Sequence, residues 1–443
     1  MSRRAFVFCS DLRNYQVFGT FLEMLYRLSL QDRFQVIPLV TVGERDAGRL
    51  ADIQATISRM LGEHQGYYQT TVSAFESSAD LSALVDELLC SVVDIEDLRG
   101  VTYRGLNIGV AIVSNLVSRY RCVSLDLDDC WPEVESYLRQ ALLFVAHFEA
   151  GIQSIGLEPD DLFYIYNGRS YNTYPQTLVL ERLEQQIIYY ERMNAGKTLR
   201  VQPCRIHDFL SMSAVVKAFW EESDDPLKGE KAKAFFEEQR TNAFAEKFAE
   251  APTGQREYVV YFVSSEDEYA SLDPRIKLSP IFATQREAVA WLISWAANQS
   301  RYQLIIRNHP NQAGICRRDF DYWHGLAGDN VDVIQSDSVI SSYDLMQGAD
   351  KVLCFFSTAG IEAAYLGVPS IVLGNAIYRG LDAVHEPDSR EQLAFMLDTD
   401  IEPKPAVNAL AHGYFTSCYG WPMAFFERLG LSRFDDYQHL FDN

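Results

Sequence analysis

The chain has 443 residues, more than a single compact core usually holds, so two domains are expected. Hydrophobic residues make up 48% of the sequence and the mean hydropathy is −0.12, which excludes a disordered or fibrous protein. Acidic residues outnumber basic ones by 61 to 39, which gives a formal net charge of −22. A surface of that charge repels phosphodiester backbones and anionic lipid headgroups, so nucleic acid is excluded as a general partner.

Cysteines and apolar segments constrain the compartment. The eight cysteines are scattered, without a CxxC pair or the spacing of a zinc site, so we expect reduced and mostly buried thiols. The apolar run after Arg3 and Arg4 stops at Ser10, too early for a signal peptide, and no stretch approaches the roughly 20 apolar residues of a membrane span. These features predict a cytoplasmic protein whose only membrane contact would be peripheral.

The first half of the chain alternates between short apolar runs and segments with helical spacing of apolar residues. We expect, in order, a strand over 5–9, a helix over 21–30, strands over 35–41 and 120–127, a helix from about 131 to 148, a strand over 161–169 and a helix from about 175 to 191. Such alternation is typical of a mainly parallel sheet covered by helices.

A second series of the same kind follows a charged stretch over 221–256. It consists of strands over 258–265, 302–310, 331–334, 351–357 and 369–374, with helices over 285–299 and 360–366. The sequence therefore predicts an α/β protein with two Rossmann-like doubly wound domains facing a central cleft. We place the domains at 1–250 and 251–405, and expect a helical segment over 406–443 that packs back on the first domain.

Polar residues follow two strands of the second series. In open α/β sheets, ligands bind at the carboxyl ends of strands. Arg307 and His309 leave one strand together, and this pair suits a phosphate because a guanidinium forks around it and an imidazole offers a directional N–H. An ordinary surface turn is the alternative. Ser264 and Ser265 follow the first strand, where their hydroxyls would contact a donor phosphate or sugar.

The segment FFSTAGIEAAYLGVPSIVLG, residues 355–374, carries the strongest signal in the chain. Ser357 or Thr358 can cap the following helix, and the small Gly360 would let a ligand approach the backbone N–H groups at the helix start. Glu362, one turn later, can accept hydrogen bonds from ribose hydroxyls. Simple helix capping explains the two hydroxyls equally well, and both roles are compatible.

This segment resembles the donor site of bacterial capsule and lipopolysaccharide glycosyltransferases, whose two-domain fold is called GT-B. Relatives that use CMP-Kdo or CMP-sialic acid pair a His-Pro motif with a Ser-Ser or Ser-Thr motif around the nucleotide phosphate. This chain has His309-Pro310 and Ser357-Thr358 in the same order, about fifty residues apart. The resemblance extends over roughly residues 300–395.

The resemblance implies that His309 contacts the donor phosphate, that Ser357 and Thr358 support it, and that Glu362 lies near the ribose. It implies a CMP- or UDP-linked sugar donor, with a CMP-Kdo-like donor favoured, and a glycan or glycolipid acceptor. A peripheral contact with the inner membrane or an assembly complex fits such an acceptor. Tyr378, which we count with the donor site, begins a stretch that departs from the aromatic motif of Kdo transferases.

Asn167 and Arg169 follow a strand of the first half in a Tyr-Asn-Gly-Arg turn that resembles an NGR element of some of these transferases. Their side chains are of the kind that binds an acceptor sugar, although a tight turn at Gly168 explains the pattern nearly as well. An inverting enzyme also needs a carboxylate as general base. The available carboxylates are Asp128, Asp129, Asp160, Asp161 and Glu191, of which Asp128, Asp161 and Glu191 are taken as candidates.

No metal or cofactor is expected. Asp126 and Asp128 have the Asp-x-Asp spacing by which other sugar transferases hold a divalent metal on a diphosphate. We favour a structural role, in which Asp128 or Asp129 caps the helix that Pro132 begins. The histidines show no HxxxH or HExxH pattern, and no GxxxxGK[ST] loop occurs.

These features predict a glycosyltransferase that moves a sugar from a nucleotide-activated donor to a capsule, lipopolysaccharide or other surface glycan. Two alternatives stay open. A UDP-sugar 2-epimerase has the same two-domain fold and a similar Ser-Gly loop. A non-catalytic nucleotide-sugar binding partner within an assembly complex would also need the donor site, without the chemistry.

Overall fold

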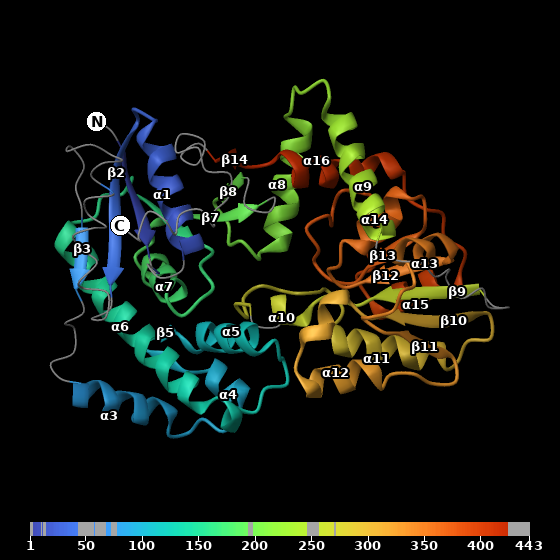
Figure 1. Ribbon diagram of the computed structural model, residues 1–443, viewed down its shortest axis with the longest axis horizontal. Helices are drawn as coiled ribbons and strands as arrows, with labels where there is room; N and C mark the ends of the chain where they lie inside the picture. The colour runs from blue at the N-terminus through green and yellow to red at the C-terminus, as the bar shows by residue number, and fades with distance from the viewer. Residues whose placement is uncertain are drawn as a thin grey trace.

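The computed structural model describes residues 3–9, 11, 15–42, 57, 68–71, 78–193, 198–245, 257–269 and 272–423. Figure 1 shows two α/β units side by side along the long axis of the molecule, the first mainly blue and green and the second mainly yellow and orange. Each unit has a central sheet with apolar clusters on both faces, so the predicted α/β class with two doubly wound units is confirmed. Within these ranges, every helix is too short or too polar to cross a bilayer.

The N-terminal sheet has seven strands in the order β14-β8-β7-β6-β1-β2-β3, in which β8 and β14 run antiparallel to their neighbours. These strands are β1 (Arg3–Cys9), β2 (Phe34–Val42), β3 (Tyr68–Thr71), β6 (Leu162–Tyr166), β7 (Gln186–Met193), β8 (Thr198–Gln202) and β14 (Trp421–Pro422). Side chains alternate across the sheet, so Ala5 and Val7 share a core with α1 (Tyr15–Ser29). Phe6 and Phe8 share the other core with α5 (Gly109–Tyr120) and α6 (Trp131–Ile155).

Helices cover both faces of this sheet. Besides α1, they are α3 (Ser78–Leu89), α4 (Ile95–Arg99), α5 (Gly109–Tyr120), α6 (Trp131–Ile155) and α7 (Tyr174–Arg182). A short hairpin of β4 (Thr102–Tyr103) and β5 (Leu106–Asn107) lies between α4 and α5.

The C-terminal sheet has five parallel strands in the order β11-β10-β9-β12-β13. The strands are β9 (Glu257–Phe262), β10 (Tyr302–Arg307), β11 (Val331–Ile334), β12 (Lys351–Cys354) and β13 (Ser370–Val372). The helices are α10 (Glu266–Tyr269), α11 (Gln285–Ala296), α12 (Arg317–His324), α13 (Ser342–Gly348), α14 (Ala359–Tyr365) and α15 (Arg390–Asp398). Four of the five strands lie within ranges predicted from the sequence, and β9 begins one residue before its predicted range, because the strands are mostly short, buried apolar runs.

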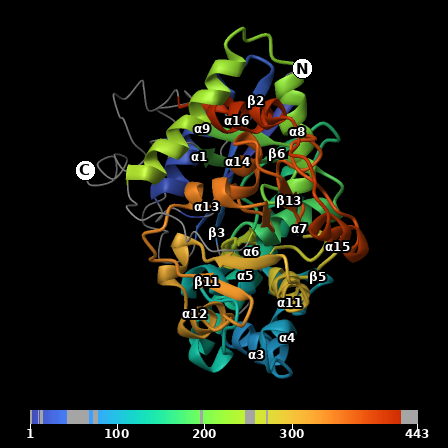
Figure 2. The same ribbon diagram turned by 90° about the vertical axis from the view of Figure 1, so that its right-hand side faces the viewer.

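The chain crosses between the units through α8 (Phe209–Glu221) and α9 (Lys228–Ala245), and returns through α16 (Leu410–Cys418). Figures 1 and 2 show α16 beside both α8 and α9, and Phe236 of α9 belongs to the core of the C-terminal unit. β14 then pairs with β8 of the N-terminal sheet. The crossover therefore begins before residue 250, and the last described residues rejoin the first unit.

Two predictions for the N-terminal unit and one for the cysteines are wrong. Residues 120–127 do not form a strand, because α5 ends at Tyr120 and a loop leads to the 3₁₀ turn η2 (Leu127–Asp129). The helix predicted over 175–191 ends at Arg182, and its last part is β7. The thiols are not all reduced, because Cys122 and Cys316 form a disulfide.

Candidate functional site

The loops at the carboxyl ends of β6 and β9 contact each other across the two units. Arg169, just after β6, donates a hydrogen bond of 2.9 Å to the carbonyl of Glu268, just after β9. Tyr174 donates a hydrogen bond of 2.8 Å to Asp273 of the C-terminal unit. A pocket between the units is lined on one side by Asn167, Gly168, Arg169, Tyr174 and His207, and on the other by Leu272, Asp273 and Ile276. Residues predicted for the acceptor side therefore lie at the interdomain contact.

His309 lies at the carboxyl end of β10, half-buried, with Nδ1 3.4 Å from Oγ of Ser265. Burial lowers the pKa of His309; Asp267 opposes this shift, and the nearby Arg307 and Arg121 add to it. The imidazole is consequently neutral at pH 7, and it keeps one N–H to donate. The guanidiniums of Arg307 and Arg121 would attract an anion at this position, whereas the carboxylate of Asp267 would repel it.

Arg307 does not present its guanidinium to a ligand, contrary to the prediction. Its side chain is 1% exposed and donates hydrogen bonds to the backbone carbonyls of Gln335 and Ser338, in the loop after β11. Burial lowers the pKa of Arg307 to about 10, so the group remains a cation at neutral pH. Its observed role is to hold that loop, and it acts on His309 through its charge.

Ser357 and Thr358 lie at the start of α14, as predicted, but the helix start is arranged differently. Thr358 occupies the N-cap position, and its hydroxyl makes no capping hydrogen bond. Instead, Oγ of Ser357 accepts the N–H of Ala359 at 3.3 Å, and the carbonyl of Ser357 accepts the N–H of Gly360 at 3.2 Å. Two of the N–H groups expected to face a ligand therefore already have partners. The half-buried Ser357 and the exposed Thr358 hydroxyl remain candidates for direct contact.

Two further donor-site candidates have structural partners. Oγ of Ser264, which is buried, accepts the N–H of Phe356 at 2.9 Å and ties the loop after β9 to the loop after β12. Glu362 is half-buried on α14, where burial and then the Glu362 carboxylate raise the pKa of Tyr343 on α13. Glu362 therefore faces a neighbouring helix, and the structure gives no support for its predicted contact with a ribose.

Gly360 and Tyr378 belong to the packing beneath the loop. Tyr378 is fully buried and donates a hydrogen bond of 2.6 Å to the carbonyl of Ser357. A Cβ on Gly360 would lie 2.6 Å from both the Tyr378 hydroxyl and Sγ of Cys354. Glycine is thus required by these two side chains, and the structure gives no support for the predicted ligand contacts of Gly360 and Tyr378.

The Gly360→Ala substitution is expected to destabilise the C-terminal unit by about 1–3 kcal/mol, because the new methyl group overpacks a buried site. The midpoint of urea unfolding measures this effect. Gly229→Ala is the matched control, because it lies in α9 with nothing within 4 Å of the added Cβ. Equal midpoints for wild type and Gly360→Ala would contradict the packing role.

On the acceptor side, Asn167, Glu191 and Arg200 form one cluster. Asn167 donates a hydrogen bond of 2.7 Å to Oε1 of Glu191, and Arg200 donates one of 2.9 Å to Oε2. Asn167 has a left-handed backbone with φ of 56°, which asparagine tolerates better than most residues. His207 lines the same interdomain pocket, and burial, followed by Arg169 and Arg200, lowers its pKa to about 3.

The other candidate bases lie elsewhere. Asp161 is 1% exposed before the amino end of β6, where Arg4 pairs with it at 2.6 Å. This is the opposite end of the strand from Asn167, so a catalytic role for Asp161 is not supported. Asp128 is exposed on η2, which Asp126 caps. The N-cap of α6 is Cys130, without a side-chain capping hydrogen bond, so the prediction that Asp128 or Asp129 caps this helix is wrong. In the described part of the chain, these aspartates belong to no metal-like group.

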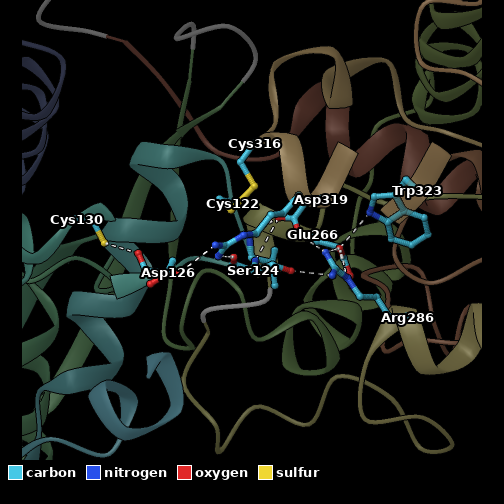
Figure 3. Close-up of a disulfide and its surroundings, with 11 residues drawn as sticks. Cys122, Ser124, Asp126, Cys130, Glu266, Arg286, Cys316, Asp319 and Trp323 are labelled. Carbon is cyan, nitrogen blue, oxygen red and sulfur yellow. Dashed lines mark hydrogen bonds and ion pairs between the residues drawn. A yellow bond between two sulfur atoms is a disulfide. The ribbon is translucent and has the colours of Figure 1, made fainter. Parts of the chain in front are cut away.

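The side chains that join the units were missed by reasoning from sequence. Arg286 of α11 donates to Oε2 of Glu266 at 2.8 Å, to Oδ1 of Asp319 at 2.6 Å and, across the interface, to Oγ of Ser124 at 2.9 Å (Figure 3). Asp319 accepts the N–H of Val123 at 2.5 Å. The sequence signal was weak, because Glu266 is only one of three consecutive acidic residues after β9.

Comparisons with known proteins point to the C-terminal unit. Residues 227–390 match the family described as capsule polysaccharide biosynthesis protein. The matched range contains α9, the whole C-terminal sheet and His309. The match relates this part of the chain to capsule polysaccharide biosynthesis proteins. No curated protein is similar enough to match the chain.

Similar solved structures are remote. The β-Kdo 2,7-transferase of Thermosulfurimonas dismutans KpsC is 19% identical, with a TM-score of 0.39, over 60% of this chain and 79% of that one. The β-Kdo 2,4-transferase of the same protein is 13% identical, with a TM-score of 0.37, over 57% and 78%. A putative UDP-N-acetylglucosamine 2-epimerase from Listeria monocytogenes is 10% identical, with a TM-score of 0.29, over 99% and 97%.

Proposed function

We propose that the chain is a glycosyltransferase that binds a nucleotide-activated sugar at the carboxyl edge of the C-terminal sheet. The observation that carries this proposal is the placement of polar side chains on three adjacent strands. His309 follows β10, Ser265 follows β9, and Ser357 follows β12, in the strand order β10-β9-β12. Ligands of open α/β sheets bind at this edge, and the His309 N–H and the serine hydroxyls are donors that a phosphate can use.

His309 would donate its N–H to the phosphate that leaves with the nucleotide, and Ser265 would orient the ring. The hydroxyls of Ser357 and Thr358 would approach the same phosphate from the next strand. Donors fixed in this way stabilise the charge that builds on the leaving phosphate. The His-Pro and Ser-Thr motifs favour a CMP-Kdo-like donor over other pyrimidine nucleotide sugars.

The acceptor, a surface glycan or glycolipid, would enter beside Asn167, where the two units meet. Glu191 is the candidate base that fits this placement, because it lies near the carboxyl end of β7 and bonds to Asn167. Its Oε1 accepts a hydrogen bond from Asn167 and its Oε2 accepts one from Arg200, and a carboxylate oxygen has a second lone pair that can accept from an acceptor hydroxyl.

Nucleotide binding tests the donor site directly. We expect CMP, CDP or UDP to raise the thermal unfolding midpoint and GDP to leave it unchanged. Ligand at a hundred times its dissociation constant stabilises the folded state by about 2.7 kcal/mol, which a thermal-shift assay resolves. Selective stabilisation by GDP, or none by any of the four nucleotides, would contradict the proposed donor class.

Product analysis separates the three chemical alternatives. With a sugar nucleotide and no acceptor, a transferase releases free nucleotide and sugar slowly. An epimerase instead converts UDP-N-acetylglucosamine to its C2 epimer and leaves the diphosphate link intact. Tight nucleotide binding with neither product, across a panel of acceptors, would show a non-catalytic binding partner.

A further inference from the structure

A disulfide joins the two units beside the candidate donor site. Cys122 follows α5 of the N-terminal unit, and Cys316 precedes α12 of the C-terminal unit. The two residues are 194 positions apart in the chain, and their Cα atoms are 5.1 Å apart (Figure 3). A covalent bond between separate units restricts their relative motion far more than a bond within one unit would.

The loop that carries Cys122 is held by the C-terminal unit on several sides. The N–H of Cys316 bonds to the carbonyl of Arg121 at 3.1 Å, and Asp319 accepts the N–H of Val123. Arg318 donates to the Ser124 carbonyl at 3.3 Å and pairs with Asp126 at 3.0 Å. The arrangement that brings the two sulfurs together is therefore the closed arrangement of the units.

The same loops contact the candidate donor site. Cys316 lies seven residues after His309 and is separated from it by the 3₁₀ turn η4 (Pro310–Gly314). Arg121, next to Cys122, pairs with Asp267 at 3.5 Å, in the loop that carries Ser265. Opening the units at this point would move both sides of the donor site.

We propose that Cys122 and Cys316 form a redox-sensitive latch that locks the two units in the closed arrangement and is released by low-molecular-weight thiols. A reagent thiolate attacks Cys316, which is partly exposed, whereas Cys122 is 4% exposed. The S–S bond breaks, its electron pair leaves on Cys122 Sγ, and a mixed disulfide forms on Cys316. A second reagent thiolate then displaces Cys316.

The net reaction balances. The two protein sulfurs are reduced and take up the two protons that the reagent thiols release, and the two reagent molecules become one disulfide. A small disulfide such as oxidised glutathione drives the reverse reaction and closes the latch. Enzymes of two domains commonly need domain opening to release product, so the locked form would turn over slowly.

A metal site at the same place is less favoured. Ligand atoms of Cys122, Cys316 and Asp319 lie within 4.8 Å of one another, so reduced sulfurs and the carboxylate would offer three ligands. However, the Asp319 oxygens already accept hydrogen bonds from Arg286 and from the Val123 N–H. A metal ion bound there would also lie beside the guanidinium of Arg286, and the repulsion between the two cations disfavours it.

The first test uses the whole wild-type chain and does not depend on the proposed function. After oxidation by oxidised glutathione, we expect alkylation of the denatured protein to label six of the eight cysteines, with Cys122 and Cys316 recovered as one cross-linked peptide. Reduction by dithiothreitol should restore eight labels. It should also speed hydrogen exchange of amides over 121–126 and 314–320 by at least about tenfold, as expected for local opening.

The second test rests on the proposed function and measures release of nucleotide from the donor. Reduction should raise turnover by at least about tenfold, and the Cys122→Ser/Cys316→Ser variant should be fast in both conditions. Cys90→Ser is the control, because Cys90 is a free, exposed cysteine, and this variant should respond to redox state as wild type does.

Each outcome decides between the readings. The latch proposal would be overturned if the cross-linked peptide were not recovered. It would also be overturned if hydrogen exchange and turnover were the same in the oxidised and reduced protein. Stoichiometric zinc in the reduced protein that disappears in the double variant would overturn it in favour of a metal site. A redox-dependent exchange rate with no turnover in either state would support the latch and count against the proposed function alone.

Discussion

Replacing His309 with alanine should reduce release of nucleotide from the sugar donor by about 10²–10³-fold, the usual cost of losing one fixed donor to a developing negative charge. The fold should survive, because His309 is half-buried and its hydrogen bond with Ser265 is long, at 3.4 Å. Single-turnover measurements at saturating donor give the rate, and circular dichroism with thermal unfolding shows that the protein remains folded.

Two further variants sharpen this result. His309→Gln keeps a side-chain N–H of similar reach, so part of the lost rate should return. His324→Ala is the matched control, because His324 is a half-buried histidine in the last turn of α12, bonded to the carbonyl of Phe320. It should behave as wild type. A wild-type rate in His309→Ala would show that His309 does not act in the reaction. The proposed donor site would then lose its main support.

The C-terminal unit could be predicted well from sequence for a physical reason. Its strands are short apolar runs, buried on both faces of a parallel sheet, and loops of glycine, proline and polar residues separate them. The residues that follow the strands are therefore placed by topology alone, which is why His309, Ser265 and Ser357 could be assigned to one edge. Topology does not fix the direction of a side chain, so the burial of the Arg307 and Tyr378 side chains could not be predicted in this way.

The errors in the N-terminal unit have another cause. The segment over 120–127 is apolar enough to suggest a strand, yet it is covered by the second unit: Cys122 is bonded to Cys316, and Val123 donates its N–H to Asp319. The periodicity of a sequence shows that a segment is buried and does not show which unit buries it. For the same reason, neither the disulfide nor the network around Arg286 could be derived from spacing.

Replacing Arg286 with leucine should destabilise the C-terminal unit by about 3–5 kcal/mol near neutral pH, because it leaves two buried carboxylates without their cation. Glu266 is 8% exposed and Asp319 is 2% exposed, and both accept hydrogen bonds from this guanidinium. The loss would also remove the bond to Ser124 and so weaken the contact between the units. Urea unfolding under reducing conditions measures the effect without a contribution from the disulfide.

The pH dependence of this effect follows from the two carboxyl groups. Burial raises the pKa of Glu266, although Arg286 opposes this shift. The contribution of Glu266 to stability is therefore complete below the pKa that Glu266 has in the unfolded chain, and it is lost as the pH rises through the pKa of Glu266 in the folded protein. Burial also acts to raise the pKa of Asp319, but hydrogen bonds led by that of Arg286 hold it below its ordinary value. The contribution of Asp319 to stability is therefore present above the pKa that Asp319 has in the unfolded chain, and it is lost as the pH falls through the pKa of Asp319 in the folded protein.

Without Arg286, no other group opposes as strongly the rise in pKa that burial causes. Both carboxyl groups should therefore protonate more readily. The difference in unfolding midpoint between variant and wild type should therefore be larger at pH 7.5 than at about pH 5. Arg301→Leu is the matched control, since Arg301 also pairs with two carboxylates, Glu257 and Asp400, but all three are exposed at the surface. Its midpoint should stay close to that of wild type at both pH values. A deficit in Arg286→Leu that is equally large at both pH values would mean that lost packing, and not unpaired buried charge, accounts for it.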